Sequence, residues 1–299
     1  MVSENYRLGD HVEREFAFLE AETQQLALAM LGQKIYGTDE RILRLAKNLQ
    51  QSDFVVQAAE RVERCDPLVI RWDDWLELVV QECLLPFDEV TYWHSIRMNK
   101  VIVWIRQLVN KYGLGIIPDL GFVESRYFSE TFQLTEKDWQ HLEWATKFHD
   151  ICKMCLDQTF WNYPGRYNRQ QRSQLEIHAR MFYYLGELFH VDSEVIALAV
   201  LHHKPFPRTG YPADSLIDCV MHYYTNPKFR IKLGMLILLD RYEAWTSDRS
   251  YKKAVSHPTA ISKVSKDQSA GNIVQSLSSV LDRVKEEFFP GDSVLCAVN

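Results

Sequence analysis

Cysteine is scarce in this chain, and long apolar runs are absent. The six cysteines among 299 residues show no regular spacing of the kind that marks a disulfide framework. The longest apolar runs, such as Ile231–Leu239 with its Lys232, are too short to cross a bilayer. The first residues, Met1–Arg7, contain no apolar signal region. These absences exclude a disulfide-stabilised secreted scaffold and predict a soluble, cytoplasmic protein with no membrane partner.

An excess of positive charge is also missing. The chain has 34 lysines and arginines against 40 aspartates and glutamates, a net charge of −6, and a pI of about 5.9. A protein that coats a nucleic-acid polymer is usually basic, so that class of partner is not expected. A small anionic ligand stays compatible with this composition, because a local basic pocket can lie within an acidic protein.

Strand patterns are equally weak. The sequence shows no run of alternating β-branched residues between hairpin turns and no internal repeat. Helix-forming residues dominate, so we expect an all-α fold. The expected helices cover 12–30, 39–49, 72–85, 91–111, 135–155, 169–189, 193–203, 228–246 and 271–287. Thr135 is the expected N-cap of the helix over 135–155.

Proline divides this helical pattern in two places. Pro86 falls between two expected helices, so we predict a small helical N-terminal region at 1–86 and a second domain at 87–299. The N-terminal region is the candidate for regulation or for a homodimer contact. Three prolines and a glycine prevent a helix over 204–213. Because that loop directly follows His203, we expect substrate contacts there.

Side chains that bind metals are spread over several expected helices or their ends. They are His94, His149, Asp150, His178, His202, His203 and Asp240. Neutral imidazole and carboxylate ligands suit divalent iron, manganese or zinc, and no thiolate is required. A helical bundle builds a core metal site from ligands distributed in this way. Seven residues are enough for two ions, and Asp150 has two oxygens with which to bridge them.

A pair of divalent metals has a recognised chemical use. Two ions about 4 Å apart generate a water nucleophile and hold a phosphoryl group between them. The ligand set therefore predicts the hydrolysis of a phosphate ester.

The motifs around these ligands resemble the HD-GYP family. The matching segments are His94-Ser-Ile-Arg97, His149-Asp-Ile-Cys-Lys153, His178, His202-His203 with Gly210-Tyr211-Pro212, and the stretch from Asp240 to Lys252. The resemblance covers roughly residues 88 to 285. It implies an HD-domain helical bundle with a dinuclear metal site. It also implies a signalling phosphodiesterase that hydrolyses a small anionic nucleotide, cyclic di-GMP above all.

The resemblance further implies a role for each matching residue. One metal, iron or manganese, would be held by His94, His149, Asp150 and Asp240, and the second by Asp150, His178, His202 and His203. A metal-bridged hydroxide would attack phosphorus. Lys153, the catalytic partner of Asp150, would stabilise the negative charge that develops. The substrate-binding residues would be Arg249 and Lys252 as a basic pair, together with Tyr211 and Arg97.

The loop after His203 departs from the family pattern. Where the family has His-His-Glu and then Asp-Gly, this chain has Lys204 after the histidines and then Pro207-Arg208. Lys204 and Arg208 add positive charge that favours a phosphate-rich ligand, so we include both among the expected substrate contacts. The alternative is that they are ordinary solvated charges. Some family members bind a third metal through a glutamate at the position of Val90, so two ions are expected here.

Three functions stay open on the sequence alone. The first is a phosphodiesterase that hydrolyses a cyclic dinucleotide. The second, favoured by the altered loop, is an HD hydrolase of another nucleotide or phosphorylated metabolite. The third is a catalytically silent sensor that binds a cyclic dinucleotide or a protein partner through the same scaffold.

Overall fold

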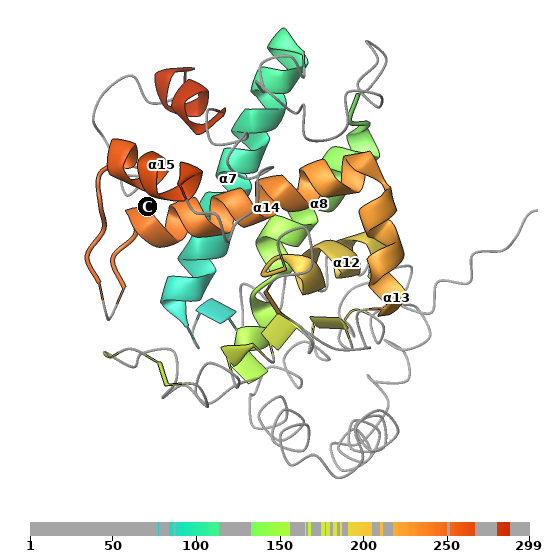
Figure 1. Cartoon of the computed structure of the whole chain (residues 1–299), viewed down its shortest axis with the longest axis horizontal. Helices are drawn as coiled ribbons and strands as arrows, with labels where there is room; N and C mark the ends of the chain where they lie inside the picture. Colours follow the sequence, from blue (N-terminus) through green and yellow to red (C-terminus); the bar gives the residue numbers. More distant parts are fainter. Residues whose placement is uncertain are drawn as a thin grey trace, which may run out of the picture.

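The computed structural model describes the helical body of the chain (Figure 1). The described residues are Glu77, 84–85, 88–113, 133–155, several positions between 165 and 186, 191–204, 210–211, 218–249, 252–266 and 280–287. Every regular element in these ranges is a helix, which confirms the all-α prediction for this part of the protein. Within it, no helix is long and apolar enough to span a membrane.

The predicted N-terminal region at 1–86 lies outside the described residues, apart from Glu77, Leu84 and Leu85. The helices expected at 12–30 and 39–49 and most of the one at 169–189 also lie outside them. The boundary near residue 86 therefore stays a prediction. The first long helix of the described part begins directly after it.

That helix, α7, covers Glu89–Tyr112. It begins where the side chain of Asp88 accepts a hydrogen bond of 3.2 Å from the backbone of Thr91. It ends at Gly113, which takes a positive φ of 77° and donates its N–H to the carbonyl of Val109 at 2.7 Å. A residue without Cβ adopts this conformation at no steric cost, which explains the glycine at the helix end.

The next helix, α8, covers Glu136–Phe148 and begins as the sequence predicts. The Thr135 hydroxyl accepts from the backbone of Asp138 at 3.2 Å, and the Asp138 carboxylate accepts from the backbone of Thr135 at 2.8 Å. This reciprocal pair is a capping box, which satisfies two backbone N–H groups that the helix start would otherwise leave unpaired.

The remaining helices complete the bundle. They are the 3₁₀-helix η4 (Ile151–Cys155), α12 (Ser193–Leu201), α13 (Asp218–Met221), the 3₁₀-helix η6 (His222–Thr225), α14 (Pro227–Thr246) and α15 (His257–Ser265), and residues 280–287 are also helical. The sequence analysis did not expect α13, η6 or α15. All three are short, and α15 begins at a Ser-His-Pro sequence whose proline suits a first helical turn.

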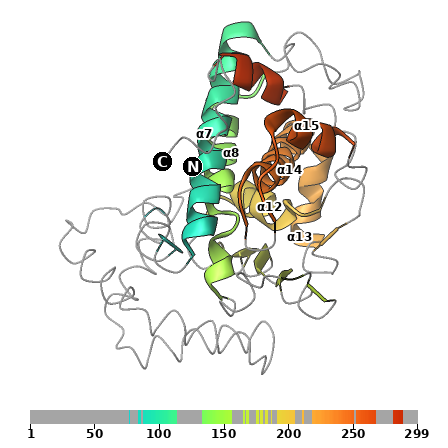
Figure 2. The ribbon, with the colours of Figure 1, turned by 90° about the vertical axis from the view of Figure 1, so that its left-hand side faces the viewer.

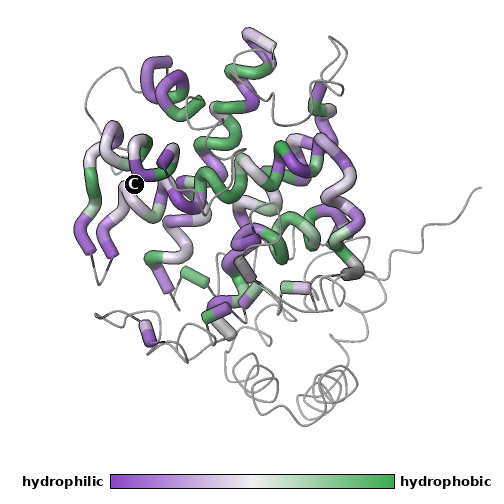
Figure 3. The backbone as a smooth tube through the Cα atoms, viewed as in Figure 1, coloured by the Kyte–Doolittle hydropathy of each residue, from purple (hydrophilic) through white to green (hydrophobic). Residues whose placement is uncertain are grey.

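The core forms where α14 crosses the pair α7 and α8, with α12 against α8 and α14 (Figure 1, Figure 2). Val195 through Leu201 of α12 are all buried, and so are Phe229 and most residues from Ile231 to Leu239 of α14. Hydrophobic stretches run along these helices (Figure 3), and their apolar side chains belong to the buried core. Burial on all sides explains why these two helices carry few charges in their buried stretches.

One group of ionisable side chains is nevertheless buried among α8, α12 and α14. His141 of α8 lies 2.6 Å from Glu194 and 3.3 Å from Asp192, measured from Nδ1 and Nε2 to the carboxylate oxygens. Lys232 of α14 is fully buried and bonds to Asp138 and Glu194, each at 2.8 Å. The opposite charges satisfy one another, which is the condition for burying such groups.

This network has a fixed relation to the predicted metal ligands. His141, Glu194 and Lys232 each lie eight residues before a ligand on the same chain segment, namely His149, His202 and Asp240. At 1.5 Å per residue, eight residues correspond to about 12 Å along a helix. The network therefore holds the three helices in axial register at a layer separate from the ligands.

We expect the substitution His141→Gln to remove a pH-dependent part of the stability. Burial lowers the pKa of His141, but the carboxylates of Asp192 and Glu194 outweigh burial, so the net shift is upward from the ordinary 6.5. A raised pKa stabilises the fold fully below the unfolded value, and this stabilisation is lost as pH rises through the folded value. Urea denaturation from about pH 6 to 9 should show a wild-type advantage that shrinks with rising pH. If the free energy of unfolding of the two proteins changed with pH in parallel, this contribution of His141 to stability would be contradicted.

Candidate metal centre

The structure brings all seven predicted metal ligands together. Asp150, His178, His202 and His203 form one group whose ligand atoms all lie within 4.8 Å of one another, and His94, His149 and Asp150 form another. Asp150 belongs to both groups. Asp240 lies between them, with one oxygen 3.4 Å from Nε2 of His94 and the other 3.8 Å from Nδ1 of His203. The arrangement offers two adjacent positions for a cation with one shared carboxylate.

Two of these ligands, His149 and Asp150, lie directly after the end of α8. The sequence analysis predicted one continuous helix to about Cys155, and that prediction was wrong. The α-helix stops at Phe148, His149 and Asp150 form a turn, and η4 continues over Ile151–Cys155. The backbone N–H of Lys153 bonds to the carbonyl of Asp150 at 2.9 Å, three residues back, which tightens the chain after the ligands. The break lets consecutive residues point toward the same centre.

Backbone carbonyls orient three of the histidines in the same way. Nδ1 of His149 lies 3.1 Å from the carbonyl of Thr146, and Nδ1 of His178 lies 2.5 Å from that of Leu175. His202 repeats the pattern at 2.5 Å with Ala199. In each case the partner is three residues earlier, and Nδ1 is the donor because a carbonyl only accepts. Nε2 is therefore left as the ligand atom, which is the usual division of roles in a metal-binding histidine.

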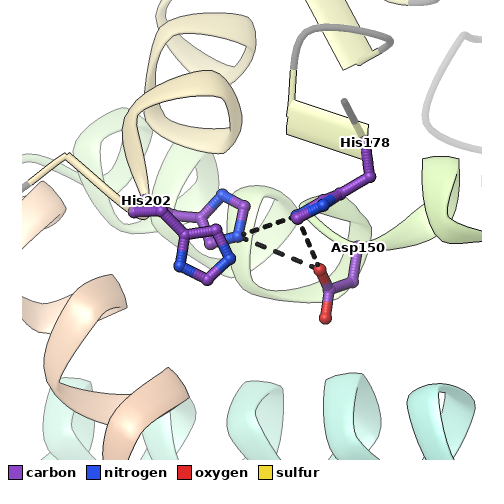
Figure 4. A group of neighbouring side chains, drawn as sticks. Asp150, His178 and His202 are labelled. Carbon is purple, nitrogen blue, oxygen red and sulfur yellow. Dashed lines mark hydrogen bonds and ion pairs between the residues drawn. The ribbon is translucent and has the colours of Figure 1, made fainter. Parts of the chain in front are cut away.

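These Nε2 atoms converge on Asp150 (Figure 4). One Asp150 oxygen lies 3.3 Å from Nε2 of His178 and 3.9 Å from that of His202. The other oxygen lies 3.4 Å from Nε2 of His149 and 3.6 Å from that of His94, and it also contacts the ammonium group of Lys153. The two carboxylate oxygens thus face different pairs of histidines, as a bridging ligand requires.

Several of these inward-facing atoms lack a hydrogen bond. Nε2 of His94, Nε2 of His149 and Oδ1 of Asp150 are buried and form none. Leaving a buried donor or acceptor unsatisfied costs about 1–3 kcal/mol. Their lone pairs and charge suit divalent cations, which would coordinate them directly. The residues present therefore fit metal binding.

The protonation states of four of the ligands also suit metal binding. Burial lowers the pKa of His178 to about 4 and that of His203 to about 3, and it lowers the pKa of His202 well below 6.5. Burial alone would raise the pKa of Asp150, but Lys153, His149 and His178 lower it well below its ordinary value. At neutral pH these histidines are neutral and Asp150 is ionised, which are the forms that bind a metal.

Glu243 is a site residue that the sequence analysis did not assign. It is buried on α14, where one carboxylate oxygen accepts the Nδ1 proton of His94. The same carboxylate accepts from Arg97 Nε at 2.9 Å and from Arg249 Nη2 at 3.1 Å, and it also contacts Ser247. Burial alone would raise the pKa of Glu243, but His94, Arg249 and Arg97 lower it well below 4.5. The sequence did offer one signal for Glu243: it follows the predicted ligand Asp240 by three residues and so lies on the same helix face.

The two described arginines among the expected substrate-binding residues, Arg97 and Arg249, lie beside this glutamate. Arg97 contacts Glu243 and Ser247, so it reaches the metal centre through Glu243. Arg249 lies closer, with Nη2 at 3.4 Å from Nδ1 of His94. Lys252 does not contact a metal ligand and instead donates to the carbonyl of Ala244.

The altered loop is described in part. The ring of Tyr211 packs against His203, with centroids 4.5 Å apart, and lies 6.3 Å from the ring of His178. Lys204 is almost entirely buried, and its carbonyl accepts a 2.7 Å hydrogen bond from the hydroxyl of Tyr224. Arg208 lies outside the described residues. The structure therefore places Tyr211 at the candidate metal centre, whereas Lys204 is anchored in the fold.

Comparison with known proteins adds no identification. No protein-family model matches the chain, and no curated protein shows significant similarity to it. What can be argued about function therefore comes from the motifs and from the geometry of the candidate metal centre.

Proposed function

We propose that the protein is a metal-dependent phosphodiesterase that hydrolyses a cyclic dinucleotide, with cyclic di-GMP as the first substrate to test. The observation that carries the proposal is the position of Asp150 in two ligand groups at once. Two divalent ions held there, iron or manganese by ligand type, would activate water and hold a phosphodiester. The HD-GYP resemblance supplies the substrate class.

The residues around the ligands have roles consistent with this chemistry. Lys153 places an ammonium group against Asp150, where it would stabilise negative charge on a phosphate. Arg249 lies next to His94 and would contribute a second cation at the edge of the centre. Tyr211, whose ring packs at a tilt against His203, would form an aromatic wall beside the bound nucleotide.

Val90 supports two ions rather than three. It is 46% exposed on the first turn of α7, four residues before His94, and its side chain offers no ligand atom.

A substrate panel tests the proposal. The full chain, loaded with manganese or with iron under anaerobic conditions, is incubated with cyclic di-GMP, other cyclic dinucleotides and nucleoside mono- and triphosphates. We expect turnover of a cyclic dinucleotide that chelation abolishes and metal restores. Turnover confined to the other nucleotides would favour an HD hydrolase of a different substrate. Binding of a cyclic dinucleotide without any turnover would favour a sensor.

A further inference from the structure

Two lysines contact one tryptophan near the C-terminal end of α14, the helix that also carries Asp240. Nζ of Lys252 and Nζ of Lys263 each lie 4.2 Å from the ring centroid of Trp245. Trp245 belongs to the last turn of α14, Lys252 to the segment that follows it, and Lys263 to α15. Cations are attracted to the face of an indole, so Trp245 holds two ammonium groups from separate elements near each other.

In the part of the chain that the structure describes, no carboxylate contacts either lysine of this pair. The neighbouring Lys253, by contrast, pairs with Asp248 at 2.9 Å. Burial together with the charges of Arg249 and Lys263 lowers the pKa of Lys252 to about 8, although the carboxylates of Glu243 and Asp240 act in the opposite direction. Like charges on neighbouring side chains repel one another, and an anion bound against the pair would relieve the repulsion.

The pair continues a cationic strip that starts at the candidate metal centre. Arg249 lies 3.4 Å from His94, and its backbone pairs with that of Lys252 through two hydrogen bonds of 2.9 and 3.1 Å. The carboxylate of Asp240, a predicted metal ligand, still acts electrostatically on Lys252. These contacts connect the candidate metal centre to the lysine pair through Arg249, Lys252 and Trp245.

The chemistry of the strip selects an anionic group rather than a base. The ammonium groups of Lys252 and Lys263 already lie over the indole of Trp245, so that ring holds lysines and is not a free platform for stacking. Ammonium groups act as compact point charges for phosphate oxygens.

We propose that Lys263, with Lys252 and Trp245, forms a subsite for the second phosphodiester of the nucleotide whose first phosphodiester lies at the metal pair. The identity of the ligand rests on the proposed function, whereas the existence of the anion subsite rests on the lysine pair itself. Lys263 is the residue that tests it, because it belongs to α15 and contacts none of the predicted metal ligands.

The test compares two substrates on the metal-loaded full chain. Cyclic di-GMP has two phosphodiester groups, and bis(4-nitrophenyl) phosphate has one. For Lys263→Gln we expect KM for cyclic di-GMP to rise about tenfold with kcat nearly unchanged, because one charge-assisted contact is lost. Neither parameter should change for bis(4-nitrophenyl) phosphate. Lys263→Arg should restore KM. Lys266→Gln, which removes an exposed lysine at the C-cap of the same helix, is the charge-matched control.

Equilibrium dialysis of cyclic di-GMP against chelated protein separates this inference from the proposed function. If wild type hydrolyses neither substrate but Lys263→Gln weakens dialysis binding about tenfold, the subsite stands and the hydrolase proposal fails. The subsite would be overturned if Lys263→Gln left KM for cyclic di-GMP unchanged or changed the kinetics of both substrates equally. It would also be overturned if Lys266→Gln had the same effect as Lys263→Gln, or if wild type bound cyclic di-GMP in neither assay.

Discussion

Replacing Asp150 by Ala should remove both metal ions and reduce turnover by at least about 1000-fold, since two-metal catalysis supplies several kcal/mol of transition-state stabilisation. The reason is the position of this one carboxylate. Its two oxygens face different pairs of histidines at 3.3 to 3.9 Å, so its loss takes a ligand from both cation positions. Elemental analysis and a cyclic di-GMP assay on the same sample measure both effects.

The control for this variant must remove the same charge elsewhere. Glu286→Gln changes an exposed carboxylate on the helix at 280–287 that lies 3.9 Å from Arg283 and touches no predicted ligand. We expect it to retain the wild-type metal content and turnover. If Asp150→Ala kept one metal per chain while losing the other, Asp150 would be a terminal ligand rather than a bridge.

Replacing Glu243 by Gln should weaken metal binding by about 10- to 100-fold, the usual effect of removing a carboxylate that orients a ligating histidine. Glu243 accepts the Nδ1 proton of His94 and so directs Nε2 toward Asp150 and Asp240. The variant also leaves Arg97 and Arg249 without their buried counter-charge. Breaking a buried ion pair costs about 3–5 kcal/mol, so the free energy of unfolding should fall by that order.

Two comparisons separate positioning from stability. Glu243→Asp keeps the charge and should recover part of the metal affinity, measured by titrating the folded apoprotein. Glu143→Gln removes a carboxylate that accepts from Arg106 at 2.9 Å on the α7–α8 contact, away from the metal centre. It should leave metal affinity unchanged. If Glu243→Gln lowered stability but bound metal like wild type, its role would be structural only.

The sequence predicted the main helices because their signals are local. Thr135 is a residue type that favours the N-cap position, and it correctly predicted the start of α8; the structure adds Asp138 as its capping partner. The apolar stretches of α12 and α14 likewise marked buried helices. The end of α8 was missed because nothing local forbids a helix through Asp150. The break depends on contacts of His149 and Asp150 with residues far along the chain, such as His178 and His202.

In the candidate metal centre, too, local signals were predictable and long-range contacts were not. Ligand types and family motifs identified seven residues that the fold brings together. Glu243 escaped because its role depends on partners at positions 94, 97 and 249, which only the packing of α7 against α14 reveals. Lys204 was expected at the substrate because its charge was the visible feature. The residue is almost entirely buried, and its backbone carbonyl accepts a hydrogen bond from Tyr224; both features depend on tertiary packing.

Electron paramagnetic resonance of the full chain loaded with manganese tests the central claim most directly. If Asp150 bridges two ions, about two Mn²⁺ should bind per chain, and the spectrum should show an exchange-coupled pair. Asp150→Ala should abolish the coupling. A spectrum of isolated ions at saturating manganese, or a single bound ion per chain, would contradict the dinuclear centre and the function proposed from it.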